Sequence, residues 1–342
     1  MSTRTTTAWA FDLGRWLVAE LGMAGPVRVE QIAGGWSNVT SFATAADGRR
    51  VVVRQPPTSH VGGGAHDVIR EARICAALEG TVVPVPKVLA TCEDPDVAPQ
   101  PFYVMALVPG EVVNCAAAAR RVSLGQRRGL GFALVDLLAD LQSVDVDAVG
   151  LGELRRNTSY LRRQLRRWRT QWAATSDHAL PAIEHVAARI EQRTADLDTG
   201  PEVLVHQDFR FGNVMLVSDP VPRISGLLDW ELATSGHPLA DLGFLGARMQ
   251  APKDVLEDGL DPSAVEGYPT FAELVEHFHR RTGLATTDIA TFVAMSAWRW
   301  AIIVSGIQQR ISRGAMGEIA QSVEWHRRRV QLLAEFAADL ID

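Results

Sequence analysis

The segment from His206 to Asn213 brings an acid, an arginine and an amide close together, and Asp229 follows 16 residues after Asn213. Transfer of a phosphoryl group needs a carboxylate that orients the acceptor hydroxyl and takes its proton. It also needs oxygen ligands for the Mg²⁺ that neutralises the triphosphate. Asp208 suits the first task, and Asn213 and Asp229 suit the second. The types and order of these residues therefore indicate phosphoryl-transfer chemistry.

Two short apolar runs predict strands that would position these acids. Residues 203–205 precede the first acid, and residues 224–228 end directly before Asp229. Both acids should then lie at strand ends, where loops present side chains to a ligand. Either half alone is also compatible with an ordinary turn or a capping residue. Two halves in this order favour a site for nucleotide phosphates.

Three residues near these acids are candidates for supporting roles. Arg210 is expected to contact the transferring phosphate, or else to be a surface arginine paired with a nearby acid. His206 is expected to brace the loop by hydrogen bonds, because Asp208 already supplies the base. Glu231 either reaches the metal through water or caps the next turn.

The first hundred residues predict a helix and a small antiparallel sheet. The expected helix covers Trp9 to Leu21, and the strands cover Val27 to Ile32, Val39 to Ala43 and Val51 to Arg54. A glycine-containing loop joins the first two strands and would let the backbone approach phosphates, unless it is a simple Gly-Gly hairpin. Its candidate nucleotide-binding residues are Gly35, Ser37 and Asn38.

A base and an acid follow this loop. Arg54 ends the third strand, and Glu71 lies in a helical pattern that begins near residue 66. In a kinase-like lobe such a pair holds the α and β phosphates, although a strand end and a solvated helix face explain each residue alone. A further strand, 102–105, precedes Pro109-Gly110, so that backbone groups of Met105 and Leu107 could line an adenine pocket at a hinge.

The remainder is predicted to be mainly helical. The expected helices cover Arg121 to Leu141, Ser159 to Trp172, Pro181 to Thr194, Pro238 to Met249, Thr270 to Arg281, and two long helices to the C-terminus. In the second, an inward apolar stripe is expected to include both tryptophans. Five arginines are expected on its opposite side, where a solvated face is favoured over an anion-binding one. These arginines are Arg162, Arg163, Arg166, Arg167 and Arg169.

Composition restricts the class of protein. The formal charge of −6 over 342 residues argues against a general nucleic-acid partner. Three widely spaced cysteines suit a reducing compartment. Residues 289–304 are the most apolar segment, but Arg299 interrupts them, so no membrane partner is expected. The N-terminus lacks an apolar signal segment, and we expect a cytoplasmic enzyme that is a monomer or a homodimer.

The motifs resemble those of the aminoglycoside phosphotransferase superfamily of small-molecule kinases, over about residues 32–329. The resemblance implies an α+β, two-lobed protein-kinase-like fold, with a nucleotide-binding lobe at 1–108 and a catalytic, substrate-binding lobe at 109–342. It implies ATP, with GTP as the alternative, and Mg²⁺ as cofactors, and a small-molecule hydroxyl as substrate. Asp241, in the stretch Gly236 to Leu242, would brace the catalytic loop.

A narrower likeness concerns the acceptor. Residues 160–168, 268–283 and 306–310 resemble the kinase-like domains fused to acyl-CoA dehydrogenases in animals, and this branch implies a hydroxyacyl acceptor. Gln164, Trp168 and Arg310 are the corresponding substrate candidates. Two alternatives remain. Acidic residues within 254–266 would suit an aminoglycoside or macrolide antibiotic, and Arg54, where many superfamily members have lysine, would suit a non-catalytic nucleotide-binding module.

Overall fold

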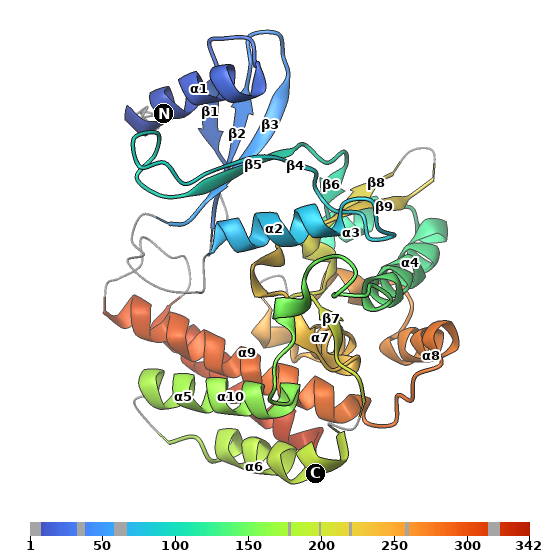
Figure 1. Ribbon diagram of the computed structural model, residues 1–342. Helices are drawn as coiled ribbons and strands as arrows, with labels where there is room; N and C mark the ends of the chain where they lie inside the picture. The colour runs from blue at the N-terminus through green and yellow to red at the C-terminus, as the bar shows by residue number, and fades with distance from the viewer. Residues whose placement is uncertain are drawn as a thin grey trace. The chain divides into compact units, whose positions relative to one another are not determined.

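The computed structural model describes residues 8–32, 38–57, 67–176, 179–197, 200–218, 221–256, 260–313 and 322–342. The chain divides into two compact units (Figure 1). The first unit comprises Met1–Gly110 and Ser225–Leu232, and the second comprises Glu111–Ile224 and Ala233–Asp342. The segment Ser225–Leu232 therefore groups with the first unit, although the predicted boundary assigned it to the C-terminal lobe.

A five-stranded antiparallel sheet forms the centre of the first unit. Its strands are β1 (Arg28–Gln31), β2 (Val39–Thr44), β3 (Arg50–Gln55), β4 (Val88–Cys92) and β5 (Phe102–Ala106), in the order β1-β2-β3-β5-β4. Two helices, α1 (Ala8–Leu21) and α2 (Val68–Leu78), and the 3₁₀ turn η3 (Trp230–Leu232) complete the unit. The expected antiparallel sheet is therefore present.

The two faces of this sheet are buried by different helices. Successive side chains of a strand point to opposite faces. Val53 and Val104 accordingly pack in one apolar cluster with Leu17 of α1, whereas Val52 and Met105 pack in another with residues of α2. The central strand β3 is covered on both sides, which fixes the direction of the side chain of Arg54, one residue before the strand ends.

The second unit is mainly helical. Its helices are α3 (Ala116–Arg121), α4 (Leu124–Gln142), α5 (Tyr160–Thr175), α6 (Pro181–Leu197), α7 (Leu239–Gln250), α8 (Phe271–Thr282), α9 (Ile289–Ser312) and α10 (Val323–Asp339). Its short strands are β6 (Glu111–Val112), β7 (Val203–Val205), β8 (Val214–Val217) and β10 (Thr234–Gly236), and β9 (Arg223–Leu227) crosses the boundary between the units. The 3₁₀ turns are η1 (Gly152–Leu154), η2 (Phe211–Asn213), η4 (Lys253–Val255) and η5 (Pro262–Ala264).

Most of the predicted elements are present within a few residues of their expected ends. The helix expected from Arg121 to Leu141 is α4 (Leu124–Gln142), and only its expected first residue, Arg121, belongs to the separate helix α3. Ser123 occupies the N-cap of α4 in extended backbone. Serine is a favoured N-cap residue, which suits a helix that begins at the next residue, Leu124.

Helix α9 is long and apolar enough to cross a membrane by length and composition alone. In this protein 78% of its most apolar 18-residue window is buried inside the fold. It contacts α5, α6, α7 and α10. This is the environment of a core helix. Its buried arginine, Arg299, bonds to Gln207 of the second unit.

Candidate active site

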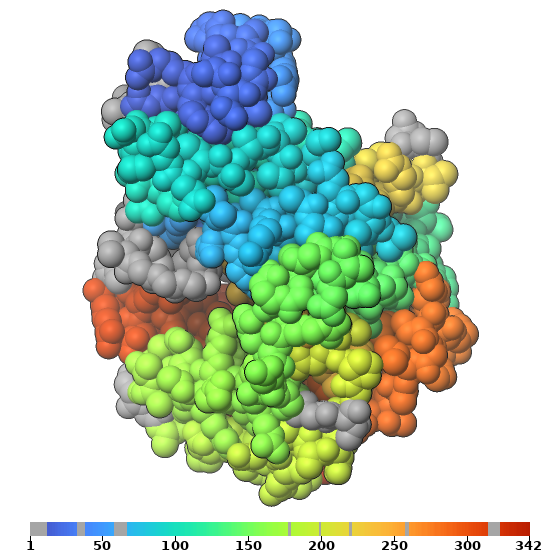
Figure 2. Space-filling model, in the orientation of Figure 1, coloured from blue at the N-terminus to red at the C-terminus, as the bar shows by residue number. Residues whose placement is uncertain are grey.

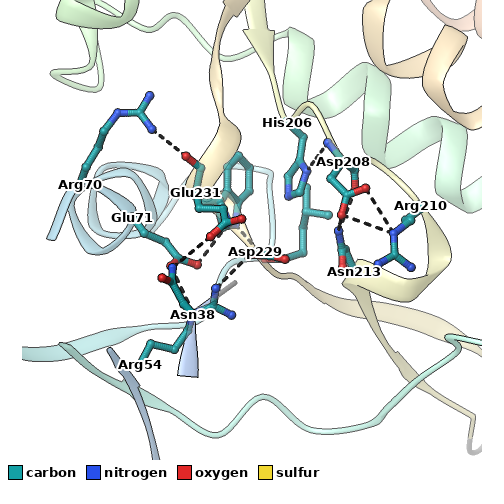
Figure 3. A network of polar contacts seen from close by, with 12 residues as sticks. Asn38, Arg54, Arg70, Glu71, His206, Asp208, Arg210, Asn213, Asp229 and Glu231 are labelled. Carbon is teal, nitrogen blue, oxygen red and sulfur yellow. Dashed lines mark hydrogen bonds and ion pairs between the residues drawn. The ribbon is translucent and has the colours of Figure 1, made fainter. Parts of the chain in front are cut away.

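Arg54 stands at the centre of a polar group in the first unit (Figure 3). Its Nε lies 3.2 Å from Glu71 Oε2, and its NH2 group lies 2.9 Å from Asp229 Oδ1. Asn38 donates to Glu231 at 3.1 Å and to Glu71 at 3.4 Å. The structure thus brings together five residues that the sequence analysis assigned to the nucleotide and the metal. Their functional roles stay predictions.

This group is buried enough for its charges to interact strongly. Burial by itself lowers the pKa of Arg54, but the carboxylates of Glu71 and Asp229 outweigh that effect and raise the pKa. Burial likewise raises the pKa of Glu71, and Arg54 opposes this shift. An arginine is therefore charged here under all physiological conditions. Its positive charge is available either to these acids or to a phosphate.

Asp229 has an unusual backbone conformation. Its φ angle of 68° lies in the left-handed region, which non-glycine residues adopt rarely. Hydrogen bonds around Trp230 hold the turn, because the backbone N–H of Trp230 donates to Glu71 at 3.3 Å and the indole donates to the carbonyl of Leu227 at 2.9 Å. Such conformations persist where the surroundings enforce them, and they are frequent at functional sites.

The loop after β7 forms a second polar group, in the second unit (Figure 3). Asn213, in η2, donates through Nδ2 to the carbonyl of Asp208 at 2.8 Å and to its carboxylate at 2.6 Å. This arrangement fixes the Asp208 carboxylate and leaves the Oδ1 atom of Asn213 as an oxygen ligand for a cation. The Asp208 side chain keeps 26% of its surface exposed, so a substrate hydroxyl could reach it.

Arg210 folds back toward this carboxylate. Its Nε lies 3.3 Å from Asp208 Oδ1. The turn has room for this only because residue 212 is glycine: a Cβ on Gly212 would lie 1.8 Å from the NH1 atom of Arg210. Both alternatives for Arg210 therefore remain chemically consistent, since the guanidinium now pairs with an acid and could pair with a phosphate.

Asp241, near the start of α7, holds the backbone of this loop. Its buried carboxylate accepts hydrogen bonds from the backbone N–H of His206 at 2.7 Å and of Gln207 at 2.8 Å. Burial raises the pKa of Asp241, and the charge and N–H group of His206 oppose that shift. His206 Nδ1 accepts from the backbone N–H of Asp208 at 3.3 Å. These contacts agree with the bracing roles expected for both residues.

The sequence analysis missed a second support of the loop. Arg299 on α9 donates to the side-chain oxygen of Gln207 at 2.6 Å and to its carbonyl at 2.5 Å. Gln207 in turn donates to the hydroxyl of Tyr160 at 2.7 Å, and its φ angle is 73°. Burial raises the pKa of Tyr160 to about 12, so this hydroxyl stays protonated at neutral pH. The one available signal was an arginine inside an apolar segment, which was taken only as evidence against a membrane span.

The remaining nucleotide-site predictions are tested less directly. Met105 is buried in β5, and Leu107 follows the strand with 40% of its surface exposed. Gly35 and Ser37 lie outside the described residues. An adenine pocket at Met105 and Leu107 therefore stays a prediction.

Helix α5 corrects part of the predicted arrangement of side chains. Trp172 is buried, but Trp168 is only half-buried and donates to Gln164 at 2.9 Å. The five arginines do not share one solvated face. Arg163 is largely buried and pairs with Glu202, and Arg167 stacks over the ring of Trp168 at 4.9 Å. The helical repeat places Arg167 on the face of Tyr160 and Gln164, which the apolar stripe alone did not indicate.

The outer arginines of α5 line a hollow with α6. Its lining residues are Arg162, Leu165, Arg166, Arg169, Thr170, Glu191, Thr194 and Ala195, and its volume is about 510 Å³. Arg169 pairs with Glu191 at 2.9 Å, whereas Arg162 and Arg166 are exposed. For these residues the expected solvated face agrees with the structure.

Within the described ranges, His, Cys, Asp and Glu side chains form no cluster of three or more that would hold a metal. Mg²⁺ commonly binds one or two protein carboxylates and takes its other ligands from substrate phosphates and water. Asp229 in the first unit offers one carboxylate and Asn213 in the second unit offers one amide oxygen, and each is a ligand type that such a nucleotide-supported ion takes. They do not fit a dedicated protein cage.

Comparisons with known proteins identify a family. Residues 28–282 match the model of the family described as "Phosphotransferase enzyme family". Acyl-CoA dehydrogenase family member 11 of Gallus gallus is 32% identical over 323 residues, which are 93% of this chain and 41% of that protein. Acyl-CoA dehydrogenase family member 10 of Mus musculus is 30% identical over 85% of this chain and 27% of its own length. The chain thus spans less than half of the curated relatives it matches.

Solved structures show the same fold. One from Ralstonia eutropha, named for the aminoglycoside phosphotransferases, has a TM-score of 0.79 and 30% identity, and the match covers 96% of this chain and 97% of that one. The GDP complex of aminoglycoside 2'-phosphotransferase-IIIa has a TM-score of 0.63 at 14% identity over 95% of this chain and 97% of that one. The predicted α+β, kinase-like fold and the family resemblance are therefore confirmed.

Proposed function

Because the chain belongs to the phosphotransferase enzyme family, we propose that it transfers the γ-phosphoryl group of ATP to a hydroxyl group of a small molecule. The observation that carries this proposal is the pairing of Asp208 with Asn213, at 2.6 Å and 2.8 Å. This contact holds an accessible carboxylate at a strand end, beside an amide oxygen that can bind a cation. A module that only binds nucleotide has no need for a fixed hydroxyl-orienting acid.

In the proposed reaction Asp208 accepts a hydrogen bond from the acceptor hydroxyl and then takes its proton. The acceptor oxygen forms a bond to the γ-phosphorus, the bond from that phosphorus to the β–γ bridging oxygen breaks, and ADP leaves with that oxygen. Arg210, which reaches Asp208, is proposed to contact the transferring group. Asn213 and Asp229 would hold Mg²⁺, which supplies neutralisation of the phosphate charge.

Arg54 is proposed to hold the α and β phosphates in place of the lysine of many family members. Its planar guanidinium offers two parallel donors to phosphate oxygens. It now bridges Glu71 and Asp229, so a phosphate must replace the contact with Asp229 at 2.9 Å. Release of that contact also frees Asp229 for Mg²⁺, which would link nucleotide binding to metal binding.

For the acceptor we propose a hydroxyacyl compound. Support comes from the likeness to acyl-CoA dehydrogenase family members, which extends over most of this chain but less than half of theirs. The antibiotic alternative was supported by the acidic residues within 254–266. Asp254 is within ion-pair distance of Arg328 at 3.4 Å, and Asp261 is buried and bonded to Arg248 at 2.7 Å. Asp261 is therefore not available to a cationic substrate, whereas Asp254 is exposed and Glu257 and Asp258 lie outside the described residues. GTP remains the alternative donor.

The test is an ADP-release screen with hydroxyacyl-CoAs, hydroxy acids, aminoglycosides, macrolides and amino alcohols. With any acceptor found, Asp208→Asn should reduce turnover by roughly 10²- to 10⁴-fold, the usual contribution of general base catalysis. Nucleotide affinity should change little. Asp339→Asn, on the exposed surface of α10, is the matched control and should leave turnover unchanged. Equal turnover of Asp208→Asn and wild type would contradict the role of Asp208.

One observation favours a second candidate, a non-catalytic nucleotide-binding module. Arg54 pairs with the very carboxylate that should hold the metal. Such a module would show a nucleotide-dependent thermal shift that does not depend on Mg²⁺, and neither ATP hydrolysis nor acceptor phosphorylation. A Mg²⁺-dependent shift together with ADP release would exclude it.

A further inference from the structure

Two neighbouring helices of the second unit, α5 and α9, contain no acidic residue. The sequence of α5 has five arginines and that of α9 has two, and neither helix has an aspartate, a glutamate or a lysine. The two helices contact each other, and α5 also forms part of the outer face of this unit, in light green in Figure 2. Any polar surface that they form together is therefore neutral or positive.

Four polar residues of α5 lie on the face that meets α9. They recur at intervals of four, three and four residues, which places them in one stripe of the helix. At one end of the stripe, the first residue binds Gln207 of the catalytic loop at 2.7 Å. At the other end, the fourth lies close to α9. The four residues are Tyr160, Gln164, Arg167 and Gln171.

The facing stripe of α9 is formed by Arg299, Gly306 and Arg310, at intervals of seven and four residues. Arg299 binds the same Gln207 as Tyr160 does. A Cβ on Gly306 would lie 3.5 Å from Gln171 Nε2 and 4.0 Å from Arg310 NH1. The helices thus run side by side in the same direction from the catalytic loop. We call Gln164, Arg167, Gln171, Gly306 and Arg310 the acid-free seam.

Arg167 lies in the middle of this seam. Its side chain is accessible, and its guanidinium stacks over the ring of Trp168 at 4.9 Å. Over the part of the chain that the structure describes, neither Arg167 nor Arg310 forms an ion pair. Burial, and then the nearby charge of Arg299, lower the pKa of Arg167. A guanidinium next to a second cation and without a carboxylate is a place where an anion would be stabilised.

Arg167 is exposed, but its surroundings differ from those of the other arginines of α5. Other arginines of α5 have acids from neighbouring segments, since Arg163 pairs with Glu202 and Arg169 pairs with Glu191, each at 2.9 Å. Arg166 is a solvated surface residue on the side of the helix that lines the hollow with α6. Arg167 is also exposed, but it has no acid partner among the described residues and stands on the stripe that leads to the catalytic loop.

We propose that the acceptor carries a negatively charged group and that Arg167 binds this group; the inference rests on the proposed phosphotransferase function. The guanidinium fork fits a carboxylate or a phosphate ester with two parallel hydrogen bonds. A polycationic acceptor such as an aminoglycoside would instead meet like charge from Arg167 and Arg310. The acid-free seam thereby determines which hydroxyl compounds bind.

The position of Arg167 also determines the shape of the acceptor. It lies seven residues beyond Tyr160, which touches the loop, and seven helical residues span about 10 Å. The anionic group and the reacting hydroxyl therefore belong to opposite ends of an extended molecule. A long-chain ω-hydroxy acid satisfies this requirement, whereas an acid with the hydroxyl on the adjacent carbon does not.

The test compares three acceptors of equal length: ω-hydroxydecanoate, its methyl ester and ω-aminodecanol. A thioester of the same chain with a phosphate-bearing carrier separates a phosphate ester from a carboxylate as the anion. For wild type, kcat/KM for the best anionic acceptor should exceed that of the ester by roughly 10- to 100-fold, the usual effect of a charge-assisted hydrogen bond. Arg167→Gln should remove this preference by raising KM for the anion alone. Arg166→Gln, about 100° around α5 from Arg167 and on the side that lines the hollow with α6, should leave it intact.

The possible failures are distinct. A preference for the ester or the amine, or an unchanged KM for the anion in Arg167→Gln, would overturn the inference while the phosphotransferase function stands. If no acceptor is phosphorylated, calorimetric binding of ω-hydroxydecanoate and the phosphate-bearing thioester still decides the matter. Tighter binding of either to wild type than to Arg167→Gln supports the anion site, and equal binding refutes it.

Discussion

The contact between Arg299 and Gln207 provides the sharpest test of how the fold controls the catalytic loop. Arg299 is 7% exposed and makes two hydrogen bonds to Gln207, at 2.6 Å and 2.5 Å. Replacement by methionine keeps an unbranched apolar side chain but removes both donors. It leaves the amide oxygen and the carbonyl of Gln207 without those partners, at a residue whose φ angle of 73° needs support.

The expected size of the effect follows from these bonds. A hydrogen bond to a charged group contributes about 1.5–3 kcal/mol, so the loss of two corresponds to about 3–6 kcal/mol of local stability. Each 1.4 kcal/mol is a factor of ten, and water entering the site recovers part of the loss. We therefore expect Arg299→Met to lower the exchange protection of the Gln207 amide, which donates to Asp241 at 2.8 Å, by roughly 10²-fold or more.

The assay is hydrogen exchange by mass spectrometry on peptides covering 203–213, together with turnover once an acceptor is known. Arg248→Met is the matched control. Arg248 is also poorly exposed, bonds to Asp261 at 2.7 Å and stacks over Trp300 at 5.0 Å, but it does not touch the loop. It should loosen the segment around Asp261 only. Unchanged exchange of 203–213 in Arg299→Met, or an equal loss in Arg248→Met, would refute the reasoning.

Three further results are expected. Gly212→Ala should displace the Arg210 guanidinium, because the new Cβ would lie 1.8 Å from its NH1 atom. We expect turnover to fall to the level of Arg210→Ala while the thermal midpoint stays close to that of wild type. Full activity of Gly212→Ala would show that turnover does not depend on the folded-back position of Arg210. Arg54→Lys should retain more ATP affinity than Arg54→Met in calorimetry, and equal affinities would remove the assigned phosphate contact. The pKa of the Glu273 carboxylate is lowered to about 2 by the Arg128 side chain and by Thr270 at the N-terminus of α8. Its contribution to folding stability should therefore be present above pH 4.5 and disappear as the pH falls from 4.5 toward 2. The thermal midpoint of Glu273→Gln should converge with that of wild type over this range, and a constant difference would contradict the assignment.

The spacing of apolar residues along the chain predicted much of the fold, because it shows which faces of each strand and helix are buried. The continuous apolar runs of β3 and β5 report two covered faces, and the apolar repeats of α5, α6, α8 and α10 report one buried stripe each. Arg54, Glu71 and Asp229 were found because their chemistry and order are specific. Their convergence in the first unit, at 3.2 Å and 2.9 Å, is seen only in three dimensions.

The sequence by itself determined the family, the kinase-like class and the identity of the acid and amide at the loop after β7, since covalent order suffices to recognise a motif. Only the tertiary structure decided how Gln207 is held and which way Arg167 faces. The partners of Gln207 come from α5, α7 and α9, and each is separated from it by tens of residues. A residue's helical face can be calculated from its spacing, but which neighbour meets that face depends on how the helices pack, and packing is a property of the whole chain.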